Sequence, residues 1–264
     1  MEMRRKWGLA VGALLILCAL IFIKAPGYAR ERALLVISLY DRYQEKQSVA
    51  EKLGISIQMP LENMELFPLL VTYNDEHLSR FLEKPLHFTV DYTFGDFIDG
   101  TGHSRIYDPY DPFYNAYLGY YSITGYGDRI TEKKLMLLSE YDMLHLALPA
   151  VGLSAKEGTF EIQSHERMPE DLILSSYAFT AYESILRTNG PEHQGESFAP
   201  GDLLFGKSPP SPVSYPLHEM KGRVYLHYFE DQDLNLIFYT LGKSDALLDD
   251  FEEDILKETE IIFP

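Results

Sequence analysis

The sequence contains very little cysteine, and this excludes several kinds of site. Cys18 is the only cysteine among the 264 residues, and it lies in an apolar segment near the N-terminus. The rest of the chain therefore cannot form a disulfide, a thiolate zinc site or a cysteine nucleophile. The Asn-x-Ser/Thr glycosylation motif is also missing, so nothing indicates a eukaryotic secretory setting. A bacterial envelope protein fits these absences best.

Several reactive motifs are absent as well. The sequence has no H-E-x-x-H or His-x-His metal pattern, no G-x-S-x-G elbow and no S-x-x-K dyad. Residues 201–208, GDLLFGKS, match the phosphate-loop pattern, but Pro209 and Pro210 follow at once and prevent the helix that the motif requires. We interpret this match as coincidence. The absences favour a protein that does not catalyse a reaction, although a carboxylate pair can hydrolyse bonds without a local signature.

Positive charge is scarce. The chain has 23 basic and 40 acidic residues and a net charge of −17. Residues 1–30 hold five of the basic and one of the acidic residues, so the remainder carries 18 against 39, a net charge of −21. This charge argues against nucleic acid as a partner, because phosphate binding is driven by clustered Lys and Arg. The acidity belongs to the part of the chain that follows the N-terminal segment.

One long uncharged run is present. Residues 7–23, which begin with Trp7 and end with Ile23, contain no charge and follow a basic tail over residues 1–6. This pattern predicts a single transmembrane anchor or an uncleaved signal. Cleavage is an alternative, since Gly27 and Ala29 form a small-x-small site. The three adjacent cations of the tail favour a cytoplasmic N-terminus, which places the large domain outside a cell membrane. Basic residues also follow the run, so the alternative of a regulatory domain that faces the cytoplasm stays open.

The remaining pattern predicts an α+β fold, with a mainly antiparallel sheet and flanking helices, because strands and helices alternate without a βαβ rhythm. Residues 24–53 are expected to form a helical stalk and residues 54–264 an acidic domain. A Pro/Gly-rich loop is expected over residues 189–222. We expect strands at 55–59, 66–73, 86–94, 115–125, 143–153, 158–164 and in a hairpin over 223–241, and helices at 30–52, 74–84, 131–141, 169–190 and 244–258, the last capped by Ser244.

The densest polar chemistry lies between residues 91 and 128. Four residues of this stretch are candidates for acid–base catalysis or for a calcium site, since carboxylates near a histidine suit both: Asp99, His103, Asp108 and Asp111. No D-x-D-x-D-G loop supports the metal, so calcium is a weak expectation and no other cofactor is expected. The alternative is local, because Asp-Pro pairs make consecutive turns.

Tyrosines of the same stretch are candidates for an exposed ligand-binding platform: Tyr107, Tyr110, Tyr114, Tyr117 and Tyr121. Strand propensity favours the opposite interpretation, in which they belong to the core with their hydroxyls reaching polar groups. The sequence EDQDLN offers Asp231, Asp233 and Asn235 as another possible metal loop, but it suits a hairpin tip better.

These observations predict a membrane-anchored bacterial envelope protein whose acidic domain acts as a binding module. A protein, a cationic peptide or a glycan would be its partner, and acidity favours the cationic one. The rival hypothesis is an envelope hydrolase that uses the Asp/His cluster.

Overall fold

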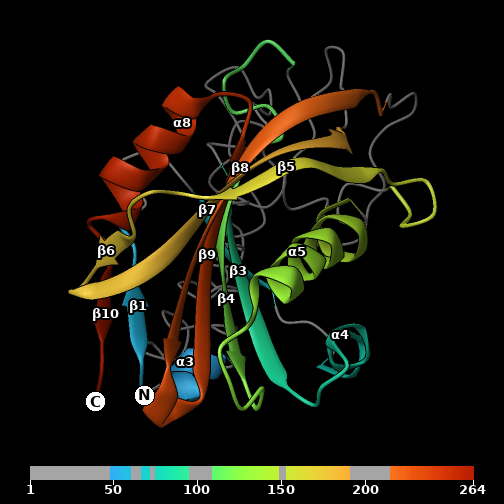
Figure 1. Cartoon of the computed structure of the whole chain (residues 1–264). Helices are drawn as coiled ribbons and strands as arrows, with labels where there is room; N and C mark the ends of the chain where they lie inside the picture. The colour runs from blue at the N-terminus through green and yellow to red at the C-terminus, as the bar shows by residue number, and fades with distance from the viewer. Residues whose placement is uncertain (1–47, 61–66, 72–74, 95–108, 149–152, 191–214) are drawn as a thin grey trace, which may run out of the picture.

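A computed structural model of the chain describes residues 48–60, 67–71, 75–94, 109–148, 153–190 and 215–264. Its centre is an antiparallel sheet with the strand order β2-β3-β4-β9-β8-β7-β5, and β6 pairs with β7 alone (Figure 1). Two short strands, β1 and β10, form a separate antiparallel pair. The strands are β1 Ser56–Gln58, β2 Phe67–Val71, β3 His87–Phe94, β4 Tyr117–Thr124, β5 Phe160–Arg167, β6 Leu172–Leu174, β7 Tyr177–Asn189, β8 Leu217–Phe229, β9 Leu234–Gly242 and β10 Glu260–Ile262.

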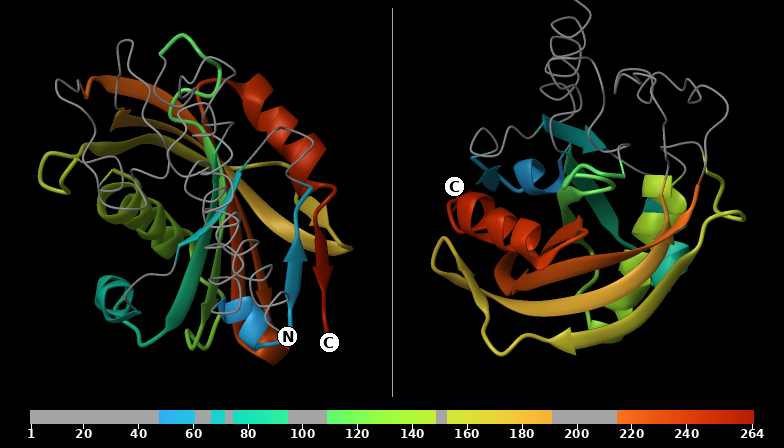
Figure 2. Two further views of the ribbon diagram at one scale, coloured as in Figure 1. Left: turned by 180° about the vertical axis from the view of Figure 1, so that it is seen from behind. Right: turned by 90° about the horizontal axis from the view of Figure 1, so that it is seen from above.

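Helices cover both faces of the large sheet (Figures 1 and 2). Helices α4 and α5 pack on one face with the π-helical segment η4, and α8 packs on the other with the π-helical segment η6. The helical elements are α3 Val49–Lys52, α4 Asp75–Leu82, α5 Glu132–Tyr141, η4 Asp142–Ala147, the 3-10 turn η5 Glu230–Gln232, α8 Asp245–Asp250 and η6 Phe251–Leu256. The expected α+β class with a mainly antiparallel sheet is confirmed.

Strand β4 shows why the middle of the sheet reads as apolar throughout. Tyr117 and Tyr121 point into the cluster under α5, whereas Leu118 and Tyr120 point into the cluster under α8. Successive side chains of a strand face opposite sides, and here both sides are covered. Every residue of β4 except Thr124 is therefore buried.

Several expected elements are confirmed. The strands near residues 55–59, 66–73, 86–94 and 158–164, the helices near 74–84 and 131–141, and the hairpin of β8 and β9 occur where the pattern placed them. Ser244 caps α8 by accepting a hydrogen bond from the amide of Leu247, and Leu248, Phe251 and Ile255 are buried as expected. The structure describes only the C-terminal end of the expected 30–52 helix. This end is α3, and the chain leaves the helix just before Gly54, whose φ is 77°.

Three expectations were wrong. Residues 169–190 form β6 and β7 and no helix. Residues 142–147 form η4, which continues α5, where an extended segment was expected. The expected loop over 189–222 includes the start of β8 at Leu217. In the first case the turn explains the error: Ser175 and Ser176 both have positive φ, of 46° and 74°, an arrangement that usually selects Asn-Gly.

The expected membrane anchor, residues 7–23, lies outside the described residues. Within the part of the chain that the structure describes, no helix is long and apolar enough to cross a membrane.

Candidate functional site: the acidic face of helix α8

The expected acid–base cluster is described only at Asp111. Asp99, His103 and Asp108 lie outside the described residues. The side chain of Asp111 accepts a hydrogen bond from the amide of Phe113 at 2.8 Å, and its carbonyl accepts one from the amide of Tyr114 at 3.1 Å. Asp111 thus stabilises a turn immediately before β4, which is the local role that an Asp-Pro pair predicts.

The tyrosines of the same stretch divide into exposed and buried members. Tyr110 is 94% exposed, whereas Tyr114, Tyr117 and Tyr121 are buried, and Tyr107 lies outside the described residues. Tyr114 also contacts His218, with 2.7 Å between its hydroxyl and Nε2. The exposed platform is therefore excluded for the three buried rings, and the core interpretation is confirmed for them.

The buried rings of β4 surround a carboxylate that sequence reasoning missed. Asp142, at the start of η4, is only 2% exposed. Its Oδ1 accepts hydrogen bonds from the hydroxyls of Tyr121 at 2.6 Å and Tyr239 at 2.8 Å, and its Oδ2 accepts one from Tyr117 at 2.8 Å. Burial, and then the charge of Asp142, raises the pKa of Tyr117 well above its usual value, and the same two causes raise the pKa of Tyr141 to about 12. The Tyr117 hydroxyl therefore stays protonated, and able to donate to Asp142, to a higher pH than an ordinary tyrosine would.

This arrangement is too closed to receive a substrate. Asp142, Tyr117 and Ser184 line a cavity of about 40 Å³ between η4 and the sheet. That space suits one or two water molecules, whereas ligand sites are typically about 300 Å³ or larger. We conclude that Asp142 is a polar anchor of the core.

A serine hydroxyl, a histidine imidazole and a glutamate carboxylate lie next to one another beside this cavity, in the order of a catalytic triad. Ser184 Oγ lies 2.7 Å from Nδ1 of His165, whose Nε2 lies 4.0 Å from Glu132. Ser184 lies in the middle of β7, opposite His165 on β5 and Gly222 on β8, so its backbone belongs to the sheet ladders. Nucleophilic catalysis needs room for an acyl group and free donors for an oxyanion. The small cavity and the paired backbone argue against that chemistry and favour a cross-strand pair.

The polar side chains of the hairpin tip hydrogen-bond to a neighbouring loop of the chain. Asp233 has a positive φ of 45°, and its carboxylate accepts hydrogen bonds from the amides of Gly125 at 3.0 Å and Gly127 at 2.8 Å. Asn235 accepts a hydrogen bond from the amide of Ile130 and donates one to the carbonyl of Asp128. Among the described residues there is no group of three or more His, Cys, Asp or Glu that could hold a metal ion.

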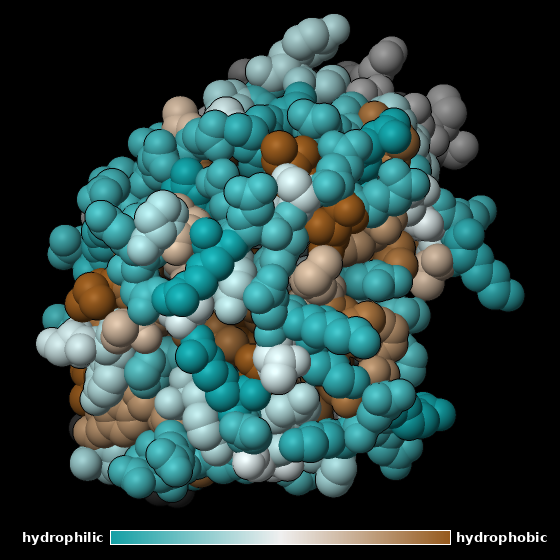
Figure 3. Space-filling view, viewed as in Figure 1, coloured by the Kyte–Doolittle hydropathy of each residue, from teal (hydrophilic) through white to brown (hydrophobic). Residues whose placement is uncertain are grey.

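Exposed negative charge is concentrated on the face of the sheet that α8 covers. Residues 245–260, which form α8, η6 and the start of β10, contain eight acidic residues and one lysine. The carboxylates of Asp245, Asp249 and Glu253 are 51%, 60% and 63% exposed. The surface over α8 is mostly hydrophilic in Figure 3. The apolar residues of this segment face the sheet, so its outward face is almost entirely acidic.

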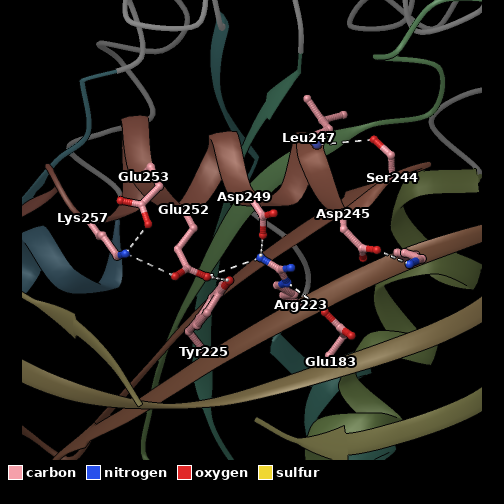
Figure 4. A network of polar contacts seen from close by, with 11 residues as sticks. Glu183, Arg223, Tyr225, Ser244, Asp245, Leu247, Asp249, Glu252, Glu253 and Lys257 are labelled. Atoms are coloured by element: carbon pink, nitrogen blue, oxygen red, sulfur yellow. Dashed lines mark hydrogen bonds and ion pairs between the residues drawn. The ribbon is translucent and has the colours of Figure 1, made fainter. Parts of the chain in front are cut away.

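A single buried arginine supports this face from below (Figure 4). The side chain of Arg223, on β8, is 8% exposed, and its Nε donates to Glu183 on β7 at 3.0 Å. Its Nη1 lies 2.7 Å from Asp249 and 3.5 Å from Glu252. Burial alone would lower the pKa of Arg223, but hydrogen bonds to Asp249 and Glu183 outweigh it and raise the pKa. The guanidinium is thus permanently charged and fixes three carboxylates from two layers.

Two lysines and a tyrosine complete the network. Lys257 contacts Glu253 and lies 3.6 Å from Glu252, and Lys221 contacts Asp245. Tyr225 donates to Glu252 at 2.9 Å. The eight acids of residues 245–260 and Glu183 make nine carboxylates, and Arg223, Lys221 and Lys257 make three cations, which leaves a net charge of −6. The sequence signal for this face was the acidic run DDFEEDILKE, which had predicted only a terminal helix.

Comparison with known proteins gives little further information. No family model and no curated protein matches the chain. A solved structure that aligns with it is the crystal structure of LpqN, involved in cell envelope biogenesis of Mycobacterium tuberculosis. The alignment covers 82% of this chain and 98% of that chain, with 11% sequence identity and a TM-score of 0.26. This similarity is too low to establish a common fold.

Proposed function

We propose that the chain is a membrane-anchored binding module of the bacterial envelope, and that the acidic face of α8 receives a cationic protein or peptide. The observation that carries the proposal is the net charge of −6 of residues 245–260 together with Glu183, Lys221 and Arg223, in which seven of the nine carboxylates are exposed. The anchor at residues 7–23 and the extracytoplasmic position of the domain belong to the same proposal and are supported by the sequence pattern.

The cations that contact the carboxylates of the α8 face make this face suited to binding. Arg223 and the two lysines hold some of the carboxylates in place, so less side-chain entropy is lost when a partner binds. The uncompensated charge around them attracts cations over about 10 Å at moderate ionic strength. Binding should therefore be fast and should weaken as salt rises.

Catalysis has no comparable support among the described residues. Asp111 stabilises a turn, Asp142 is enclosed by tyrosines, and Ser184 lies within the sheet. The binding function is accordingly the one that the geometry favours.

The proposal can be tested with the full-length chain in detergent and a fluorescent oligolysine peptide as the probe. We expect binding that weakens by at least tenfold between about 50 mM and about 500 mM NaCl. Neutralising three exposed acids of the α8 face, in the variant D250N/D254N/E258Q, should weaken binding several-fold at low salt.

A matched variant controls for overall charge. E76Q/E132Q/E157Q removes the same number of negative charges from the α4–α5 side of the molecule, and all three positions are exposed. If the two variants lost affinity equally, binding would depend on net charge alone and the proposed site would be wrong. If binding did not respond to salt, the electrostatic function itself would be wrong.

A further inference from the structure

Two histidines meet where α4 packs against the end of α5. The rings of His77, on α4, and His145, on η4, lie 5.0 Å apart between centroids. Tyr141 and Phe81 complete the contact: the ring of Tyr141 lies 5.3 Å from His77 and 5.2 Å from His145, and that of Phe81 lies 5.2 Å from Tyr141. The hydroxyl of Tyr141 also lies 3.1 Å from Nδ1 of His77. Both histidines are half-buried, so protons reach them from solvent without unfolding of the chain.

The two ends of α4 are held by different forces. At its C-terminal end, Lys134 of α5 donates a hydrogen bond to the carbonyl of Leu82 at 3.0 Å and lies 3.3 Å from Glu83. Leu82 at this end and Leu78 in the middle of the helix are also buried in the core. The contact with η4 is made by His77 and, one turn later, by Phe81, whose rings lie 5.0 Å and 5.8 Å from the ring of His145. At the first turn of α4 the two partners in this contact are therefore imidazole rings.

We propose that His77 and His145 form a pH-sensitive latch, which holds the first turn of α4 against η4 at neutral pH and releases it in acid. Two imidazolium rings at this separation repel each other, and each loses hydration where it is half-buried. Lys134 and the buried Leu78 and Leu82 still hold the rest of α4, so the first turn would move without unfolding of the domain.

The electrostatics of the contact agree with this direction. Burial first, and then His77, lowers the pKa of His145, while Glu140 opposes the shift. Among the described residues, the titratable groups at this contact are the two histidines and, from α5, Tyr141 and Glu140, and the charge of Asp142 on η4 acts on Tyr141; Phe81 is neutral. A histidine whose pKa is lowered in the closed state binds more protons in the open state. The latch is therefore stable above the ordinary histidine pKa of about 6.5 and is weakened as the pH falls through that value.

Hydrogen exchange of the full-length chain at about pH 7.5 and about pH 5.5 tests the latch, after correction for the intrinsic pH dependence of exchange. We expect the opening constant of the α4 amides to be several-fold higher at the lower pH. The amides of β8 serve as an internal reference and should not change. An unchanged opening constant for α4 would refute the latch.

Four variants identify the groups responsible. H77Q and H145Q should each reduce the pH response of α4, and the double variant should abolish it. H227Q removes a half-buried histidine from β8 and should leave the response as in the native chain. If the double variant raised α4 exchange at both pH values, the loss of pH dependence would still support the latch. A double variant that kept the native response would contradict it. Neither outcome affects the proposed binding face, which lies on the other side of the sheet.

Discussion

On the face of the sheet covered by α5, the charge at the centre is a carboxylate, and on the face covered by α8 it is a guanidinium. Asp142 is surrounded by neutral hydroxyl groups, which satisfy it without adding charge. Arg223 is surrounded by carboxylates that outnumber it. The α5 side is thus internally complete, whereas the α8 side still has negative charge that is not neutralised. This difference separates a structural polar cluster from a surface able to attract a partner.

The comparison has a physical basis in desolvation. A buried ion is tolerated when hydrogen bonds replace its hydration, and neutral donors achieve this without a second charge. Carboxylates at the surface keep much of their hydration, so each contributes little to stability and is free to serve another purpose. We therefore expect substitutions on the α5 side to affect folding most and substitutions on the α8 side to affect binding most.

The largest expected effect is that of D142A. Removing the carboxylate takes away the common acceptor of three tyrosine hydroxyls, and a buried donor that loses its acceptor costs about 1–3 kcal/mol. We expect the free energy of unfolding to fall by roughly 4 kcal/mol, measured by urea denaturation. D142N keeps one acceptor oxygen and should lose about half as much. Equal stability of D142A and the native chain would show that the tyrosine cluster is not an anchor.

R223M should have the next largest effect. It leaves Glu183, Asp249 and Glu252 close together without their shared cation, but these carboxylates are partly exposed and screened. We expect a loss of about 2 kcal/mol in the free energy of unfolding, part of which about 0.5 M NaCl should restore. R223K should restore less than half, because lysine cannot donate in several directions from one plane. A variant as stable as the native chain would mean that repulsion among these carboxylates is negligible.

A smaller pair of changes sharpens the comparison. Y239F removes one of the three donors to Asp142, and Y225F removes the donor to Glu252. We expect Y239F to cost about 1.5 kcal/mol in urea denaturation, since its acceptor is buried, and Y225F about 0.5 kcal/mol. The opposite order would contradict the distinction between the two faces.

The last effect is confined to alkaline pH. The pKa of Tyr141 is raised from 10.0 to about 12, chiefly by burial. Its contribution to stability is present below pH 10 and is lost as the pH rises toward 12, because the unfolded phenol ionises first. Y141F should therefore show a shallower loss of stability above pH 10 than the native chain. Urea denaturation across this range, with ultraviolet absorbance to follow phenol ionisation, measures the difference.

Local patterns predicted much of the fold, because several elements carry their own signals. Ser244 caps α8, residues 86–94 alternate, and the β8–β9 hairpin has acidic turn residues between two apolar strands. Strand β7 lacked such a signal. It pairs with β5, β6 and β8, and its apolar residues point to both covered faces, so its pattern resembles that of a buried helix.

The two charge clusters could be predicted only in part. The tyrosines of β4 were expected in the core, but their common acceptor comes from η4 and a third donor comes from β9. Arg223 meets Glu183 across a strand pair and Asp249 across two layers. Contacts of this kind depend on tertiary packing, and no spacing within one segment encodes them. The acidic run of residues 245–260 can be recognised in the sequence. That it forms an exposed acidic surface follows only from the structure, in which its apolar side chains are buried.

Zero-length carbodiimide cross-linking of oligolysine to the full-length chain, followed by mass spectrometry, tests the central claim most directly, since it joins amines to the carboxylates they contact. The proposed binding face predicts cross-links concentrated on the carboxylates of residues 245–260 at low salt and lost at high salt. Cross-links distributed equally over Glu76, Glu132 and Glu157 would contradict it.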